Sequence, residues 1–123
     1  MVSGAQYNAI LANKMSEKAL DREVRGLLND LGLAETSFHP PDGVGRMRAG
    51  YPDWTIVGRR VLFRELKTMK GKPTKAQEKF LKALADAGQD VDIWRPIDLY
   101  SGRIARELAE VALVAVSRRR RAA

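Results

Sequence analysis

Apolar side chains recur every three or four residues over 16–31, which is the spacing of an amphipathic helix. Ser16 is a suitable N-cap and Gly32 a suitable C-terminal stop, so the pattern predicts a helix over 16–31. The same spacing predicts a second helix over 74–88 that stops at Gly88. The apolar faces of the two helices consist of Leu20, Val24, Leu27, Leu28, Leu31, Ala76, Phe80, Leu81, Leu84 and Ala87.

Alternating residues between these helices predict strands. DWTIVG, residues 53–58, and RRVLFRELKT, residues 59–68, are typical of two strands joined by a tight turn. A further strand is predicted over 90–96, and the long loop before residue 53 leaves room for a short one near 37–39. Because a helical crossover precedes the 90–96 strand, it can pair in parallel with the strand before the helix.

The order helix, two or three strands, helix, strand, helix predicts an α/β fold, a small mixed β-sheet flanked by helices. The 123 residues are expected to form a single domain. Its core covers about 16–100, followed by a C-terminal helix over about 101–117 and a basic tail over 118–123. Residues 1–15 lack a clear period and are expected to be a short helix or a loose arm.

The net charge of +7 narrows the choice of partner. The four arginines of SRRRR supply +4, which leaves +3 for the remainder by subtraction. A basic tail of this kind is either a solvated end or a grip on nucleic-acid phosphates. The absence of cysteine excludes disulfides and thiolate metal sites.

No apolar run approaches the roughly 18 residues that a membrane span needs. The longest, VALVAV at 111–116, is expected either to cover the sheet or to form a subunit interface, and the first reading is favoured. The first residues lack the basic region and apolar core of a secretory signal. These features predict no membrane association.

Two charged residues in the second strand carry the candidate chemistry. Glu65 and Lys67 lie two apart, so they point to the same face as Val61 and Phe63, which we expect to be a core face. Burying such charges costs several kcal/mol unless they are paired or bind a metal. Asp53 should lie beside Glu65 across the hairpin, and Mg²⁺ favours such a carboxylate pair. The alternative is an ordinary salt bridge to Lys67.

PDW at 52–54 and ELK at 65–67, with eleven residues between Asp53 and Glu65, resemble the PD-(D/E)xK nuclease pattern. With the following KGKPTKAQ and LADAG, the chain over about 16–100 is similar to the VRR-NUC family, the virus-type replication and repair nucleases. The resemblance implies a PD-(D/E)xK nuclease-like core. It also implies that the catalytic residues are Asp53, Glu65, Lys67 and Gln77.

Gln77 has a second interpretation, because Thr74 and Gln77 have the spacing of a helix capping box. The resemblance further implies a Mg²⁺ or Mn²⁺ ion held by Asp53, Glu65, the Leu66 carbonyl and an acid of the first helix. By helical phase the acid is Glu17, which we expect to face the core. Asp21 is the reserve, and a charge in the first helical turn explains Glu17 equally well.

The resemblance implies a metal-dependent, structure-specific DNA endonuclease of DNA repair, similar to Holliday-junction resolvases. It also implies a homodimer. The absence of cysteine suits a cytoplasmic protein of a bacterial or phage-infected cell, and the absence of a Gly-rich phosphate loop predicts no nucleotide cofactor. A non-catalytic DNA-binding module, a restriction-type enzyme for linear duplex and an RNA substrate stay open. The DNA-binding candidates are Arg46, Arg48, Tyr51, Lys70, Lys72, Lys75, Arg118, Arg119, Arg120 and Arg121.

Overall fold

A mixed β-sheet lies at the centre of the fold in the computed structural model, which describes residues 2–40 and 49–122, with side chains up to Ala112. The strands are β1 (Trp54–Val57), β2 (Val61–Leu66) and β3 (Asp90–Trp94), in the order β1-β2-β3. β1 and β2 are antiparallel, and β2 and β3 are parallel across the helical crossover. The α/β fold class, the hairpin and the parallel crossover strand are therefore confirmed.

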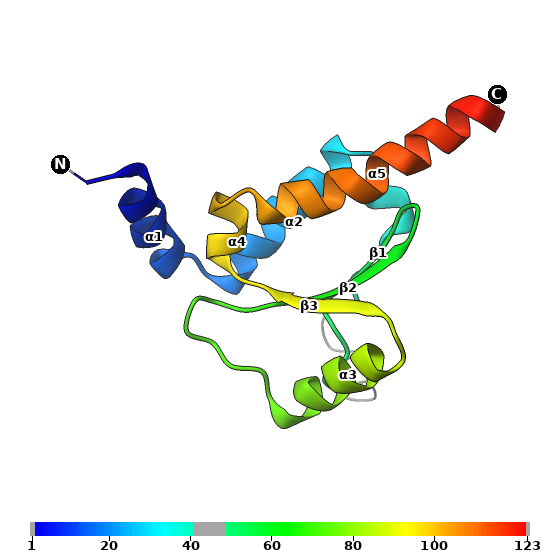
Figure 1. The fold of residues 1–123 in the computed structure, drawn as a ribbon. Coiled ribbons are helices and arrows are strands. Elements are labelled where there is room, and N and C mark those ends of the chain that lie inside the picture. Colours follow the sequence, from blue (N-terminus) through cyan, green and yellow to red (C-terminus); the bar gives the residue numbers. More distant parts are fainter. Residues whose placement is uncertain (1, 41–48, 123) are drawn as a thin grey trace.

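Helices lie on both faces of the sheet (Figure 1). α2 (Glu17–Asp30) and α5 (Arg103–Ala122) run along one face, and α3 (Lys75–Asp86) lies on the other. α2 begins as expected, because the Ser16 hydroxyl accepts a hydrogen bond from the Ala19 amide at 3.1 Å. It ends at Asp30 with Leu31 as C-cap, and the next residue, Gly32, has a positive φ of 72°, which suits a residue without a Cβ.

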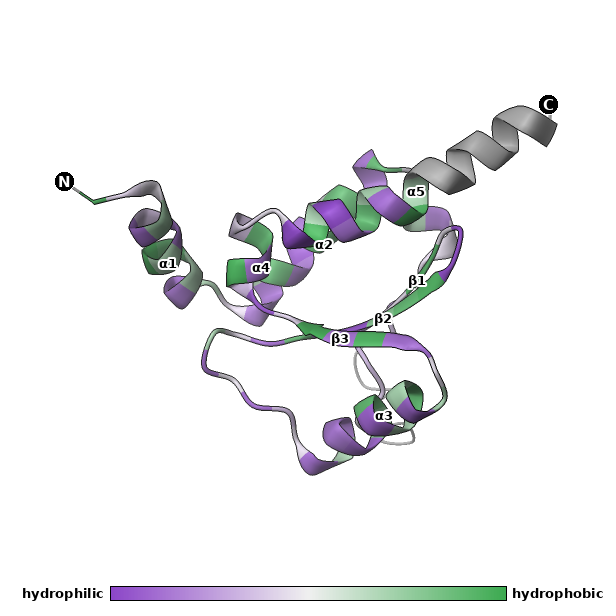
Figure 2. Cartoon of the chain, in the orientation of Figure 1, coloured by the Kyte–Doolittle hydropathy of each residue, from purple (hydrophilic) through white to green (hydrophobic). Residues whose placement is uncertain are grey.

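The apolar core is one-sided. It fills the layer between the sheet and the α2–α5 pair, whereas no residue of α3 is buried. Val61 and Phe63 point to the α3 face and are half-buried, so the expectation that they face the core was wrong. Figure 2 shows green segments interrupted by purple along the strands, and a mixture of purple and green on α3. The core consists of Leu20, Val24, Leu28, Leu33, Trp54, Ile56, Leu62, Leu66, Trp94, Ile104, Leu108, Val111 and Ala112.

The N-terminal segment forms the short helix α1 (Gly4–Lys14), one of the two expected alternatives, and it packs on the short helix α4 (Pro96–Tyr100). Other elements differ from the sequence pattern. A 3₁₀ helix, η1 (Ala34–Thr36), follows α2. The expected strand near 37–39 is a single bridge between Phe38 and Thr55, so the order with three strands before α3 was wrong. Pro40 has no amide hydrogen to extend that ladder.

The C-terminal helix covers the sheet, as the first reading of VALVAV predicted. Val111 is fully buried and Ala112 is 4 % exposed, and Val111 belongs to the core. The side chains of 113–116 lie outside the described part of the chain. Among the described helices, none is long and apolar enough to cross a membrane.

Gly50 generates a prediction about α3. Its φ is 91°, and a Cβ there would lie 2.3 Å from the Ala76 carbonyl carbon. Gly88 has a similar φ of 80° with no atom within 4 Å of such a Cβ. Gly88→Ala should therefore cost only the left-handed backbone penalty, about 1–2 kcal/mol. Gly50→Ala should cost more and loosen α3, because backbone must move.

The measurement is urea unfolding of both variants, with hydrogen exchange of the α3 amides. Equal losses of unfolding free energy in the two variants would show that the Gly50–Ala76 approach does not matter.

Candidate active site

The β1–β2 hairpin register brings Asp53 beside Glu65. Trp54 pairs with Arg64, so the residue before Trp54 falls opposite the residue after Arg64. The Leu66 amide donates a hydrogen bond to Oδ2 of Asp53 at 2.8 Å, which fixes this carboxylate at the start of β1. The structure therefore brings together the two carboxyl groups that the hairpin pattern predicted.

Glu65 is buried, with 1 % of its surface exposed. Among the described residues, its Oε2 has no hydrogen-bond partner. Burial and the adjacent Asp53 carboxyl group together raise the pKa of Glu65 to about 9, although the Lys67 ammonium opposes the rise. At neutral pH the metal-free protein therefore holds a proton on Glu65.

Lys67 follows directly after β2 and lies on the same face of the strand as Glu65. Its amide donates to the Trp94 carbonyl at 3.1 Å, which extends the pairing of β2 with β3. Its ammonium lies 3.7 Å from Oε1 of Glu17, and 11 % of its side chain is exposed. Glu17 itself is half-exposed at the first position of α2, so the expectation that it faces the core was wrong.

The two carboxyl groups suit a hard cation. In the described part of the chain, no three acidic or histidine side chains form a cluster for a metal ion. Mg²⁺ needs no such cage, because one or two carboxylates with water and substrate phosphate suffice. The unpartnered Oε2 of Glu65 and the neighbouring Asp53 carboxylate supply that pair. The residues present therefore fit Mg²⁺ or Mn²⁺.

Gln77 forms the capping box with Thr74. The Gln77 amide donates to the Thr74 hydroxyl at 3.1 Å, and the Thr74 amide donates to Oε1 of Gln77 at 2.9 Å. The capping interpretation is confirmed, and the catalytic role of Gln77 stays a prediction.

The DNA-binding candidates lie in different places. Tyr51 shares a hydrogen bond with the Thr55 hydroxyl at 2.9 Å and meets the Phe80 ring edge-on at 5.7 Å. It therefore also joins β1 to α3. The candidates Lys70, Lys72 and Lys75 are exposed on the loop after Lys67 and at the start of α3. Those whose positions or side chains fall outside the described part are Arg46, Arg48, Arg118, Arg119, Arg120 and Arg121.

Arg95 is a site-supporting residue that the sequence did not indicate. Its guanidinium Nη1 donates to the carbonyls of Thr68 and Gly71 at 2.6 and 2.7 Å. These bonds hold the loop that follows Lys67 and carries Lys70. No local pattern distinguishes such a long-range arginine from a surface one.

Asp21, the reserve metal ligand, has other partners. Its Oδ1 accepts from the Trp54 indole nitrogen at 2.8 Å, and its Oδ2 accepts from Nε of Arg25 at 2.7 Å. This carboxylate holds α2 to β1. The structure therefore gives Asp21 a structural role.

Comparison with known proteins supports the fold. No family model and no curated protein matches the chain. A solved structure described as a VRR_NUC domain protein superimposes with a TM-score of 0.55 at 23% sequence identity, covering 73% of this chain and 88% of that chain. The chain thus has the fold of a VRR_NUC domain, a small mixed sheet flanked by helices, and the resemblance of its motifs to that family is confirmed at the level of the fold.

The raised pKa of Glu65 predicts how stability depends on pH. In the metal-free protein, folding retains a proton that the unfolded chain releases near its ordinary pKa of 4.5. The contribution is complete below that value and is lost as pH rises through about 9. The free energy of unfolding should fall by up to about 1.4 kcal/mol per pH unit between these limits.

Glu65→Gln should remove this slope, since an amide keeps its hydrogens at every pH. The measurement is the free energy of unfolding of the wild type and of the Glu65→Gln variant, obtained by urea unfolding from pH 5 to 9 in the presence of a chelator. Parallel curves for the two proteins would contradict a raised pKa at Glu65.

Proposed function

We propose that this protein is a metal-dependent nuclease that hydrolyses phosphodiester bonds. The observation that carries the proposal is the buried Glu65 carboxyl beside the partly buried Asp53, with an oxygen of Glu65 unpartnered among the described residues and the Lys67 ammonium nearby. Such an arrangement lowers the stability of the fold, because a buried polar atom without a hydrogen-bond partner is unfavourable. A role in binding a ligand would explain why the sequence contains it. The name of the structural neighbour, a VRR_NUC domain protein, supports the same class.

Each residue has a distinct role in this proposal. Asp53 and Glu65, with the Leu66 carbonyl as a further ligand, would hold Mg²⁺ or Mn²⁺. The bound ion would polarise the phosphate and lower the pKa of a coordinated water. Lys67 orients the attacking water or stabilises charge on the phosphate, held by its ion pair with Glu17. Gln77 lies at the start of α3 and positions the substrate strand.

We propose DNA, and branched DNA in particular, as the substrate. Exposed Lys70, Lys72 and Lys75 follow the Lys67 strand and suit contacts to phosphates beside the scissile bond. Arg46, Arg48, Tyr51 and the arginines of the tail would extend this contact. Symmetric cutting of a four-way junction needs two active sites, which a homodimer would supply.

Lys67→Ala should lower the rate of cleavage by about 10²–10⁴-fold, because it removes a group that acts in the transition state. DNA affinity should change little, since one ammonium contributes little to phosphate binding. The measurement is cleavage of a labelled four-way junction and a matched linear duplex in Mg²⁺ and in Mn²⁺, with affinity measured in a chelator.

The matched control is Lys79→Ala, which makes the same charge change at an exposed position of α3. It should cut at the wild-type rate. Metal-dependent cutting by the Lys67 variant at the wild-type rate would remove Lys67 from the mechanism. Binding without cutting by the wild type in either metal would leave a DNA-binding module and overturn the nuclease.

A further inference from the structure

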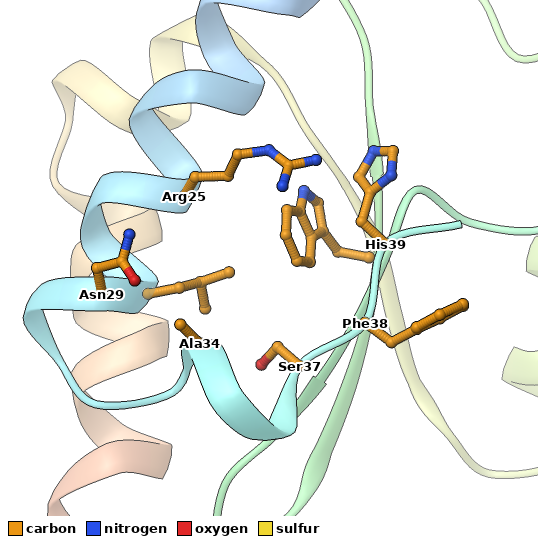
Figure 3. Close-up of a pocket in the computed structure, with 8 residues that line it drawn as sticks. Arg25, Asn29, Ala34, Ser37, Phe38 and His39 are labelled. Atoms are coloured by element: carbon orange, nitrogen blue, oxygen red, sulfur yellow. The ribbon is translucent and has the colours of Figure 1, made fainter. Parts of the chain in front are cut away.

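A cavity of about 330 Å³ lies between α2, the segment at 34–39 and the start of β1 (Figure 3). Its volume lies near the lower end of the roughly 300–1,000 Å³ that small-ligand sites occupy. In Figure 3 Arg25 reaches from α2 toward His39, while Ala34 and Ser37 lie at the opposite end. The lining residues are Arg25, Leu28, Asn29, Ala34, Ser37, Phe38, His39 and Trp54.

The cavity is built from the elements that carry the candidate active site. Trp54 follows Asp53 directly in the chain, and α2 carries both Glu17 and Arg25. Arg25 lies eight positions after Glu17 along the helix, a rise of about 12 Å. One strand of B-DNA advances about 3.4 Å per nucleotide, so this rise corresponds to three or four nucleotides. A strand that passes Glu17 could therefore span the distance along α2 to Arg25.

Asp21 organises the aromatic wall of this cavity. It binds the Trp54 indole nitrogen and Nε of Arg25, and it lies 3.6 Å from Nε2 of His39. The Arg25 guanidinium lies over the Trp54 ring, 5.0 Å from its centroid. His39 meets the same ring edge-on, also at 5.0 Å. The result is a flat guanidinium held in place beside an imidazole.

This chemistry suits a nucleobase better than a phosphate. The Arg25 charge is already paired with Asp21, which weakens it as an anion site. About half of the Arg25 side chain is nevertheless exposed, and bases stack on arginine planes as well as on aromatic rings. Leu28 and Ala34 supply apolar contact, and the Asn29 amide and Ser37 hydroxyl can bond the polar edge of a base.

We propose that this cavity binds one unpaired base of the nucleic-acid strand on which the active site acts. The proposal rests on the proposed function and adds a preference for substrates with an unpaired nucleotide near the cut. Base stacking of this kind is worth about 1–3 kcal/mol, which corresponds to roughly 5- to 150-fold in affinity.

The test compares a DNA duplex that carries one unpaired 2-aminopurine with the same duplex lacking that nucleotide. Affinities are measured in a chelator, so that cutting does not interfere. The wild type should bind the first duplex about tenfold more tightly and change the 2-aminopurine fluorescence. Ala34→Phe, which fills the cavity from an exposed position, should bring the ratio of affinities to about one and abolish the fluorescence change.

Two further variants separate stacking from charge. Arg25→Leu should lower the ratio of affinities several-fold. Arg22→Ala removes the same charge from an exposed position of α2 that does not line the cavity, so it should weaken both duplexes equally and keep the ratio. Unfolding temperatures of all variants establish that they are folded.

A wild-type ratio near one, or a ratio that Ala34→Phe leaves unchanged in a folded protein, would overturn the base pocket. If the wild type still cuts DNA in Mg²⁺, that result leaves the proposed nuclease standing. Failure to bind or cut any DNA would overturn both proposals. If the protein binds deoxyadenosine monophosphate at micromolar concentration but does not prefer the duplex with the unpaired nucleotide, the cavity binds a free nucleotide. That result would overturn the proposal that the base comes from the nucleic-acid strand.

Discussion

The hydrogen bond from the Leu66 amide to the Asp53 carboxylate holds Asp53 next to Glu65. Two ionised carboxylates at this separation would repel each other. The hairpin register places Asp53 opposite Glu65, and this bond holds the Asp53 side chain at the strand edge. Burial then leaves Glu65 with a raised pKa and one oxygen without a partner among the described residues. We propose that a divalent cation replaces the proton on Glu65, because the cation would neutralise both carboxylates. The proposed chemistry depends on this exchange of a proton for a metal ion.

The one-sided core explains how so small a sheet tolerates the pair. Packing with α2 and α5 stabilises the opposite face, while no residue of α3 is buried on this one. Arg64 of β2 is 3 % exposed, and it donates to Asp90 at 2.9 Å and to Glu107 at 3.1 Å. The Trp94 indole also donates to Glu107 at 2.9 Å. This network fixes β3 against β2 and α5. It thereby also fixes the Trp94 carbonyl, which accepts the hydrogen bond from the Lys67 amide.

Features with a local cause could be predicted from the sequence. The Ser16 and Thr74 caps, the hairpin and the Asp53–Glu65 pairing all follow from short-range patterns, and the structure contains each. Features set by distant partners could not be predicted. The half-exposure of Glu17 and the loop clamp of Arg95 depend on how whole elements pack. The core pattern also misplaced Val61 and Phe63, because alternation identifies two faces of a strand without showing which one the larger helices cover.

Proton release on metal binding tests the central claim most directly. Calorimetry of Mn²⁺ binding at pH 7, repeated in buffers of different ionisation enthalpy, counts the protons released per bound ion. The account predicts about one proton for the wild type and none for Glu65→Gln, because the ion displaces the proton that burial retains on Glu65. Metal binding at the Asp53–Glu65 pair without proton release would contradict the account, since Glu65 would then be ionised before the metal arrives.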